Sequence, residues 1–455
     1  MAISSILTRK RSRPRPWRVA CVVLTVAAAT AAGADGTWDR PGDGVWTNPT
    51  SWLGGVPNGV GETAFFGPDA PSRPSAVIQL NESITVGTID DANANQIRLT
   101  GPGPLVFDAV GLGTPVTIDL RQNGGELDLR TPIVLIDDPL TVRTVDASEI
   151  IFSGLFQGGA DDLTKEGAGL LSIDEATDDW TGRLLVAEGT VEIRDSSGLG
   201  AGSGTLADGT IVSVDGTLAI ARNVTIVDER VRLDGAAISG GQSGSAAFNG
   251  PLELSADSRA TNQGAEATLN LGGTIEGPGG LNVDRGIVEL RGEIQFGGQL
   301  TVAGATVGIR SAAAHGGSRV GPGGVMKVRS SGSLVDAGMV TVDAGGELRI
   351  VAPAGSDPST SSVSPASILL EEGTLTLARI DFSPSGLLAS ASQGGVLLLE
   401  KLPTYTAGGT DMIDFDAIGG RDLRLGAKTD ATLPAGVALL PESATTTLRF
   451  GGGPA

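Results

Sequence analysis

Residues 163–205 read LTKEGAGLLSIDEATDDWTGRLLVAEGTVEIRDSSGLGAGSGT, and this stretch decides the fold. It holds three short apolar runs, Gly169–Ile173, Arg183–Val186 and Thr190–Ile193, separated by glycine or by Asp/Ser turns. No run is long enough for a helix, and each ends at residues that tolerate tight turns. The stretch therefore predicts short strands joined by tight turns.

The same pattern of short apolar runs separated by turn residues continues through most of the chain. Polar and apolar residues alternate within the runs, as in the sequence VTIDL of Val116–Leu120. This alternation is typical of strands with one buried side. Glycine followed by threonine and an aliphatic residue recurs, because glycine suits a corner and threonine suits the start of a strand. Between residues 76 and 140 the predicted strands are Ala76–Leu80, Ile84–Ile89, Gln96–Leu99, Leu105–Asp108, Val116–Leu120, Glu126–Leu129 and Ile133–Ile136.

Residues 163–200 also resemble one copy of the autotransporter-associated β-strand repeat, in which L-T-K-x-G-x-G precedes a polar loop with an aromatic residue and a G-T-[LV] strand. Gly277–Leu281 with Gly286–Leu290 resembles a degraded second copy that lacks the Thr-Lys pair. The resemblance implies a right-handed β-solenoid in a large exported bacterial protein, here without the autotransporter barrel, and it implies no catalytic residues. The residues that match are Leu163, Thr164, Lys165, Gly167, Gly169, Leu171, Ile173, Trp180, Thr181, Gly182, Gly189, Thr190, Val191, Ile193, Leu199 and Gly200.

Composition supports a stacked fold. The 455 residues include 69 glycines but only 4% aromatic residues, which fits a narrow core of aliphatic side chains better than a broad globular core. We predict an all-β right-handed parallel β-helix with a Trp-rich N-terminal cap. Tandem antiparallel β-sandwiches remain the alternative, because short strands at regular spacing suit them equally well.

The N-terminus predicts export. A basic region that ends at Arg18 precedes the apolar Val19–Ala29 and an A-x-A cleavage site at Ala32–Ala34, so we expect no stable membrane span after cleavage and an extracellular or outer-surface location. A Ser/Pro-rich stretch, APAGSDPSTSSVSP, predicts a linker or loop. The predicted segments are a signal peptide (1–34), an N-terminal cap (35–75), a solenoid (76–351) with the repeat at 163–205, the linker (352–365) and a C-terminal β segment (366–455).

Charge and cysteine content limit the partners. The only cysteine, Cys21, lies in the signal, so the exported chain has no thiol for disulfides or metal ligands. Removal of the signal takes six of the 32 basic residues and none of the 52 acidic ones, which leaves 26 basic residues and a net charge of −26. This balance argues against nucleic acid as a partner. It is compatible with loosely bound divalent cations, and no other cofactor is expected.

Three of the four tryptophans beyond the signal, Trp38, Trp46 and Trp52, lie within fifteen residues of one another. Large rings of this kind can cover the open end of a solenoid core, so we interpret 35–75 as a cap. A pair of exposed tryptophans also suits sugar stacking, and glycan contact at these three residues is the functional alternative.

Candidate catalytic residues are sparse. The single histidine, His315, lies in AAAHGG and is interpreted as a turn residue, which leaves poor material for a zinc site or a catalytic triad. Acidic pairs at Asp90-Asp91, Asp137-Asp138, Asp161-Asp162 and Asp178-Asp179 also lie in turn-like stretches. For a polysaccharide-active β-helix enzyme, the only candidate set is Asp178-Asp179 with Arg183 and Lys165.

The sequence therefore predicts a non-enzymatic secreted or cell-surface repeat protein, an adhesin-like scaffold whose partners are surface polysaccharide or other surface proteins. A carbohydrate-binding β-helix protein and a polysaccharide-active β-helix enzyme are the alternatives. The sequence stops soon after LRFGGG at residues 448–453. A soluble secreted protein and a truncated reading frame with a missing anchor both remain open.

Overall fold

The computed structural model describes most of the chain beyond residue 33, and its described residues belong to one compact unit. The predicted signal peptide, apart from Ala34, and the predicted linker 352–365 lie outside the described residues. The described ranges are 34–68, 75–112, 115–175, 179–200, 202–264, 266–311, 313–329 and 338–351, with the shorter segments 368–371, 373–378, 388–391, 395–400, 414–416, 423–427 and 448–451.

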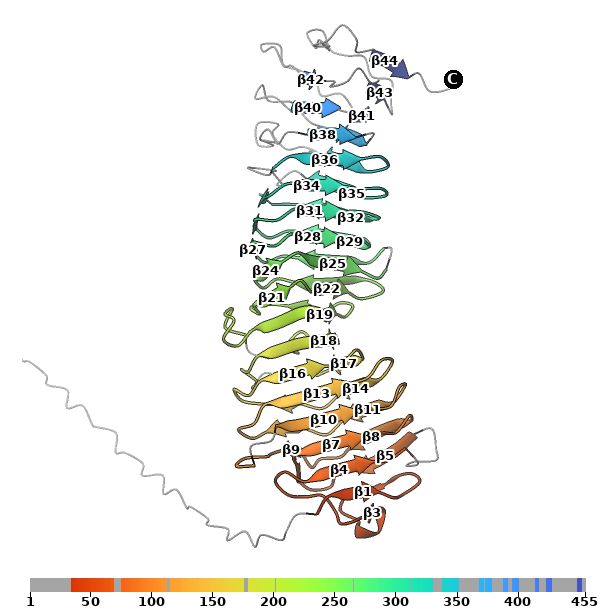
Figure 1. Ribbon diagram of the computed structural model, residues 1–455, viewed down its shortest axis with the longest axis vertical. Coiled ribbons are helices and arrows are strands. Elements are labelled where there is room, and N and C mark those ends of the chain that lie inside the picture. The colour runs from red at the N-terminus through yellow and green to blue at the C-terminus, as the bar shows by residue number, and fades with distance from the viewer. Residues whose placement is uncertain are drawn as a thin grey trace, which may run out of the picture. The chain divides into compact units, whose positions relative to one another are not determined.

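The chain folds as a parallel β-solenoid of about 12 turns, which confirms the all-β stacked prediction (Figure 1). In the coils, strands pair in parallel with the strand one coil earlier, as Leu140–Thr144 pairs with Val116–Leu120. Antiparallel β-sandwiches would instead pair neighbouring strands through hairpins. Among the described strands only β1 (Gly36–Trp38) and β3 (Trp52–Leu53) pair antiparallel, so the sandwich alternative is wrong.

Each regular coil carries strands at three positions, which we call faces 1, 2 and 3. Face 1 consists of β4 (Thr63–Phe66), β7 (Thr88–Asp91), β10 (Val116–Leu120), β13 (Leu140–Thr144), β16 (Leu163–Glu166), the first halves of β18 (Leu184–Ile193) and β19 (Thr210–Ile220), β21 (Val231–Asp234), β24 (Leu252–Ala256), β27 (Ile275–Gly277), β30 (Ile294–Phe296) and β33 (Ala313–His315).

Face 2 continues beyond the predicted linker, because β36 pairs directly with β38. It consists of β2 (Gly44–Val45), β5 (Ser75–Gln79), β8 (Gln96–Thr100), β11 (Glu126–Leu129), β14 (Glu149–Phe152), β17 (Leu170–Ile173), the second halves of β18 and β19, β22 (Ala237–Gly240), β25 (Ser258–Asn262), β28 (Leu281–Val283), β31 (Leu300–Val302), β34 (Ser318–Val320), β36 (Val340–Asp343), β38 (Ile368–Glu371), β40 (Leu388–Ala391) and β42 (Asp414–Asp416).

Face 3 is built from two separate sheets. The first consists of β6 (Ile84–Val86), β9 (Leu105–Phe107), β12 (Ile133–Leu135) and β15 (Phe156–Gln157). The second consists of β20 (Thr225–Ile226), β23 (Ser245–Phe248), β26 (Thr268–Leu271), β29 (Gly286–Leu290), β32 (Ala305–Ile309), β35 (Val325–Arg329), β37 (Glu347–Val351), β39 (Thr374–Ala378), β41 (Gly395–Glu400), β43 (Leu423–Ala427) and β44 (Leu448–Gly451).

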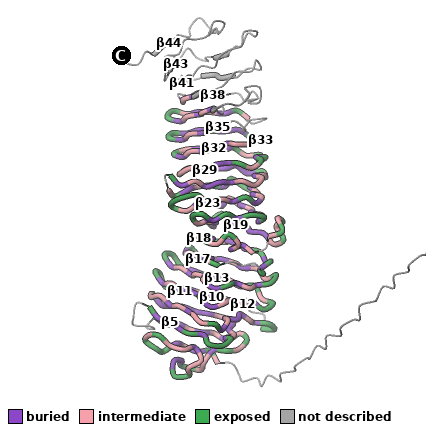
Figure 2. Tube along the Cα trace, turned by 180° about the vertical axis from the view of Figure 1, so that it is seen from behind, coloured by how far each residue is buried: buried purple, intermediate pink, exposed green. Residues whose placement is uncertain are grey.

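Register alignment builds the core. Alternate residues of each strand point inward, and the parallel pairing places each inward residue over its counterpart in the next coil. Burial accordingly alternates along the strands (Figure 2). On face 2 the resulting inward column is aliphatic over eight coils. Its members are Ile97, Leu127, Ile150, Leu171, Val191, Leu218, Ile238 and Ala260, all at most 1% exposed.

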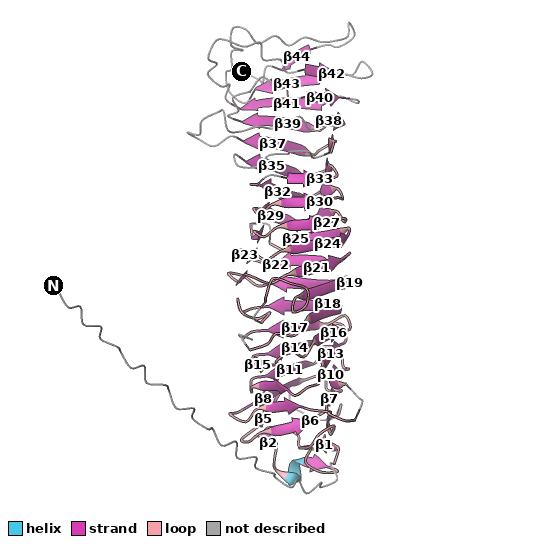
Figure 3. Ribbon diagram, turned by 90° about the vertical axis from the view of Figure 1, so that its left-hand side faces the viewer, coloured by secondary structure: helices cyan, strands magenta, loops and turns pink. Residues whose placement is uncertain are grey.

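The N-terminal end departs from the coil pattern. The short helix η1 (Pro49–Ser51) is the only helix among the described residues, and Asn48 caps it by accepting a hydrogen bond from the Thr50 backbone NH (Figure 3). The strand β3 follows η1 directly and pairs antiparallel with β1. This two-residue strand ends the ladder of parallel strands at the N-terminal end. Such a short strand leaves little free edge for pairing with another chain.

Two predicted strand boundaries differ from the structure. The predicted strand Ile84–Ile89 is divided at Gly87 into β6 and β7, because the chain turns a corner between faces 3 and 1 there. Conversely, the runs Arg183–Val186 and Thr190–Ile193 form the single strand β18, which passes from face 1 to face 2 without a loop. Short apolar runs therefore locate strands but do not distinguish a tight corner from a continuous strand.

Adjacent leucines test the register. Leu171 is fully buried in the inward column of β17, whereas Leu170 beside it is only partly buried. We expect Leu171→Ala to lower the free energy of unfolding by about 2–5 kcal/mol, because it opens a cavity in the column. The matched change Leu170→Ala should cost less than about 1 kcal/mol. Urea unfolding followed by far-UV circular dichroism measures both, and equal losses would contradict the register.

Candidate functional site

The tryptophans of the cap are packed together rather than exposed. Trp38, Trp46 and Trp52 are 1, 0 and 5% exposed. The rings of Trp38 and Trp52 meet edge to face at 85° with centroids 5.1 Å apart, and Trp46 meets Trp52 at 58° and 4.8 Å. Trp46 Nε1 donates to the carbonyl of Pro57 (2.8 Å). No ring offers a free face on which a sugar could stack, so this geometry does not support glycan contact here and favours the cap interpretation.

Of the acidic pairs, Asp137-Asp138 and Asp161-Asp162 lie close together, and burial with these neighbouring charges raises the pKa of Asp161. Asp90 and Asp91 lie at the end of strand β7, not in a turn as interpreted from sequence, and both are buried. Asp178 lies outside the described residues. Arg183 forms a surface ion pair with Asp162 (2.6 Å). Lys165 points into the core, so the enzyme candidates Arg183 and Lys165 do not share a site.

Lys165 occupies an inward position of β16, between Val142 and Val186 of the neighbouring coils. It is 0% exposed, and its ammonium donates to the backbone carbonyls of the next two residues and of Glu188 (3.2 Å). Burial lowers the pKa of Lys165 to about 8, although the charges of Glu188 and the adjacent Glu166 oppose the shift. The lysine of the repeat pattern therefore ties the corner carbonyls of two coils together.

Trp180 and Gly182 account for the polar loop of the repeat pattern. Among the described residues, face 3 has no strand between β15 and β20, and Trp180, 1% exposed, fills the core there. Its ring meets Phe156 edge to face (5.4 Å), and its Nε1 donates to the carbonyl of Asp161 (2.7 Å). A Cβ on Gly182 would lie 1.8 Å from that same carbonyl oxygen, so only glycine fits. These pattern residues thus have structural roles.

His315 ends strand β33 and points inward, so its interpretation as a turn residue is wrong. It is 5% exposed, its ring lies 5.4 Å from that of Phe296, and Nε2 is 2.6 Å from Ser318 Oγ. Nδ1 is buried with no hydrogen-bond partner. Burial lowers the pKa of His315 to about 4, so the ring is neutral at physiological pH.

Two carboxyl groups are also held in the core. Asp91 is 0% and Glu229 is 2% exposed, and each has one carboxyl oxygen without a partner. Burial raises the pKa of Asp91 to about 8 against the opposing hydrogen bond from the Asn93 backbone NH. Burial likewise raises the pKa of Glu229 to about 8, although Thr210 Oγ1 donates to it (2.7 Å). Both groups are therefore mainly protonated at neutral pH.

A groove of about 470 Å³ crosses face 2. Its lining comes from six successive coils and moves from the start of β14 to the end of β22 and the residue after β25. Small residues form much of its surface. The lining residues are Ala147, Ser148, Glu149, Ala168, Gly169, Leu170, Thr190, Glu192, Ala219, Ser239, Gly240, Gly241, Gln242 and Gln263.

Corner lengths explain where the groove lies. Between faces 1 and 2, four residues separate β13 from β14, three separate β16 from β17, and none interrupt β18. Gly189, with φ of +75°, turns this loop-free corner, and a Cβ there would lie 2.3 Å from the Gly167 carbonyl oxygen. Shorter corners remove the loops that would otherwise overhang the strands, so the outward side of face 2 is open from β17 to β22.

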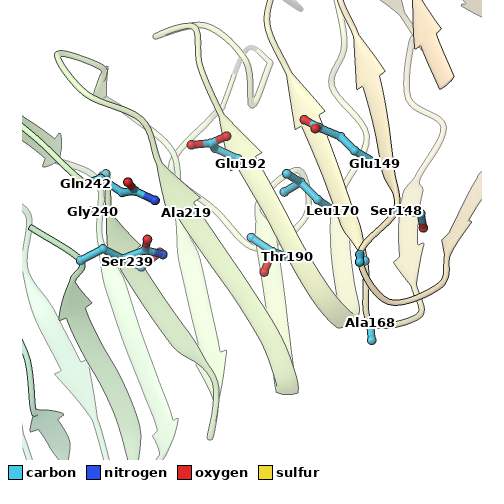
Figure 4. A pocket seen from close by; sticks show the side chains of 14 residues that line it. Ser148, Glu149, Ala168, Leu170, Thr190, Glu192, Ala219, Ser239, Gly240 and Gln242 are labelled. Carbon is cyan, nitrogen blue, oxygen red and sulfur yellow. The ribbon is translucent and has the colours of Figure 1, made fainter. Parts of the chain in front are cut away.

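One guanidinium organises the polar side of the groove. Arg194 Nε donates to Glu192 (2.7 Å), and its terminal nitrogens reach Glu149 (3.1 Å) and Asp174 (3.3 Å). Glu149 also accepts a hydrogen bond from Ser172 Oγ (2.7 Å). Burial raises the pKa of Asp174, although Arg194 opposes the shift. Figure 4 shows Glu149 and Glu192 projecting from the same side of their strands, with Ser239 and Gln242 farther along.

Sequence reasoning missed this groove. Glu192 lies in the predicted strand Thr190–Ile193, but nothing in the spacing links Glu192 or Arg194 to Glu149, 45 residues before Arg194. The alternation of residues does place Glu149 and Glu192 on outward positions, but their proximity depends on a coil register that the sequence alone does not provide. The same alternation places Lys165 on the inward side of its strand together with Leu163. The burial of Lys165 could therefore be predicted from the sequence.

Among the described residues, no group of three or more His, Cys, Asp or Glu side chains is arranged to hold a metal ion. In the same part of the chain, no helix is long and apolar enough to cross a membrane. Binding of loosely held divalent cations stays a prediction.

The buried ammonium of Lys165 provides a stability test. We expect Lys165→Met to lower the free energy of unfolding by about 1–3 kcal/mol, because buried carbonyls lose their donor. Lys327→Met, on an outward position of β35, is the matched control and should change stability by less than about 0.5 kcal/mol. If thermal or urea unfolding shows Lys165→Met to be neutral, the lysine does not tie the coils together.

The burial of His315 predicts that part of the free energy of unfolding is lost at acidic pH. Its folded pKa of about 4 lies below the unfolded value of about 6.5, so the unfolded chain takes up the proton first as pH falls. Stability contributed by the neutral ring is complete above about pH 6.5, and about 3 kcal/mol of it should be lost between there and pH 4. His315→Gln cannot titrate, so subtracting its pH profile isolates this loss. Parallel profiles would refute the assignment.

Comparison with known proteins leaves the family open. No family model, curated protein or solved structure matches this chain. The fold is shown by the structure, and membership of the autotransporter-associated repeat family stays a prediction from the residues of 163–205.

Proposed function

We propose that the chain is an exported, non-enzymatic surface protein whose solenoid acts as an adhesin-like scaffold of the autotransporter-associated repeat type. The observation that carries this proposal is the continuous parallel ladder of about 12 turns, in which every coil is held by its neighbours. Such an arrangement extends the chain along one axis and repeats its outward positions at a spacing of about 4.8 Å. A scaffold that presents binding surface along its length needs this extension and this regular repeat of outward positions.

Cross-coil ion pairs support a role outside the cell, because the exported chain has no cysteine and cannot form disulfides. Twelve of the sixteen ion pairs found among the described residues join different coils. Glu289, for example, accepts from Arg310 (2.5 Å) on the next coil and from Arg329 (3.2 Å) on the coil after that. Single exposed pairs contribute little, but networks that cross coils resist local opening more than isolated pairs do.

Export is tested at the N-terminus. When the full chain is produced in a diderm bacterium, we expect the exported protein to begin at Asp35, because the A-x-A site ends at Ala34. Intact-mass measurement of the exported and cytoplasmic fractions reads this directly. Deletion of Val19–Ala29 should keep the chain inside the cell. Retention of the undeleted chain in the cytoplasm with its N-terminus intact would contradict the export proposal.

Adhesion and catalysis are tested on the same material. Beads coated with the exported chain should adhere to bacterial or host-cell surfaces above the level of beads coated with the urea-unfolded chain, because the scaffold depends on its fold. Incubation with polygalacturonate or alginate should release no new reducing ends or unsaturated products. Release of either product would replace the scaffold proposal with the polysaccharide-active enzyme.

A further inference from the structure

We propose that the groove on face 2 binds a neutral, hydroxyl-rich glycan chain, lying across the coils from Glu149 to Gln263. This goes beyond the scaffold function, since it assigns a ligand class to a defined surface. It does not involve the cap tryptophans, whose rings are buried.

The form of the groove selects an extended ligand. Its lining residues span six coils, and five inter-coil steps of about 4.8 Å give a length of about 24 Å. Along this path Ala168, Ala219 and Ser239 present small side chains between the coils of Glu149 and Gln263. A narrow linear polymer fits such a path, whereas a compact ligand would contact only a fraction of it.

The lining chemistry suits hydroxyl groups. Carboxylates at Glu149 and Glu192 accept hydrogen bonds, and the amides of Gln242 and Gln263 both donate and accept. The side chains of Glu149 and Glu192 remain 28 and 25% exposed, so they can accept from a ligand. Sugar hydroxyls are both donors and acceptors and can satisfy this mixed set.

The carboxylates are held in place before a ligand arrives. Arg194 bonds to Glu149, Asp174 and Glu192, which lie on or directly after three successive face 2 strands, and Ser172 bonds to Glu149 as well. Fixing these side chains lowers the conformational entropy lost on binding. The strand backbones beneath them are rigid because each pairs with a coil on either side. The site is therefore preorganised.

Charge argues against acidic ligands. Around Arg194, three carboxylates face one guanidinium, which leaves two negative charges beside the groove. A uronic acid polymer, a sulfated glycan or a nucleic acid would be repelled. This charge distinguishes the proposed ligand from the pectin-like polymers considered for an enzyme.

The backbone argues against an extended peptide. Peptides that bind as strands need a sheet edge with free NH and carbonyl groups. The groove lies on the outward side of strands whose backbone groups already pair between coils, from β14 through β25. Recognition there depends on side chains, which the hydroxyls of a glycan can engage at every residue along the path.

A blocking substitution gives a direct test. The full chain is screened by isothermal titration calorimetry against cellohexaose, maltohexaose and chitin hexasaccharide, with polygalacturonate as the acidic comparison. We expect at least one neutral hexasaccharide to bind and polygalacturonate not to bind. Ala219→Phe, at an outward position in the middle of the groove, should weaken that binding at least about tenfold. Thr301→Phe, at an outward position on β31 outside the groove, is the matched control and should leave it unchanged.

Circular dichroism verifies that both variants remain folded, and Glu192→Gln provides a second reading that removes one charge at constant size. A loss of affinity on Glu192→Gln supports the proposal even if Ala219→Phe proves unstable. Failure of every neutral hexasaccharide to bind, binding that Ala219→Phe and Glu192→Gln leave intact, or preferential binding of polygalacturonate would each overturn it. None of these outcomes alters the test of export and adhesion.

Discussion

Each coil of this protein can satisfy its backbone hydrogen bonds only with the coil before and the coil after it. That constraint requires successive coils to keep the same register, so every inward residue lies over an inward residue. The aliphatic column from Ile97 to Ala260 follows from it, and so do the corner glycines whose missing Cβ atoms allow neighbouring carbonyls to approach. Outward positions align in the same way, which is how Glu149 and Glu192 reach the same guanidinium.

Polar residues at inward positions show how strictly the register is kept. Lys165 and His315 hold inward strand positions, Glu229 is buried between β20 and β21, and burial shifts the pKa of each toward its neutral form. Lys165 is compensated by corner carbonyls, whereas His315 and Glu229 each keep one atom without a partner. The ladder thus tolerates buried polar groups at a cost in stability, because shifting the register to expose them would turn the whole strand over.

The fold was largely readable from the sequence, since alternating strands such as Val116–Leu120 and glycine-marked corners depend on local chemistry. Corner geometry was less readable, as β18 shows, because Gly189 can turn a corner with or without a loop. The groove could not be predicted. It depends on which outward residues are stacked, and coil lengths vary: paired residues are 29 apart between Thr88 and Thr117 but 19 apart between Ile275 and Ile294. The cap tryptophans suited two interpretations until their burial was known.

The central claim is that outward residues of successive coils form a column along one axis. Pulsed electron paramagnetic resonance tests it in the chain with Cys21→Ser, using one spin label at Thr117 and a second at Arg232, Glu276 or Ala314. These residues lie five, seven and nine coils away in the same column. The account predicts distances that increase in proportion, to about 24, 34 and 43 Å. Distances that fail to increase along the series would contradict the stacked ladder.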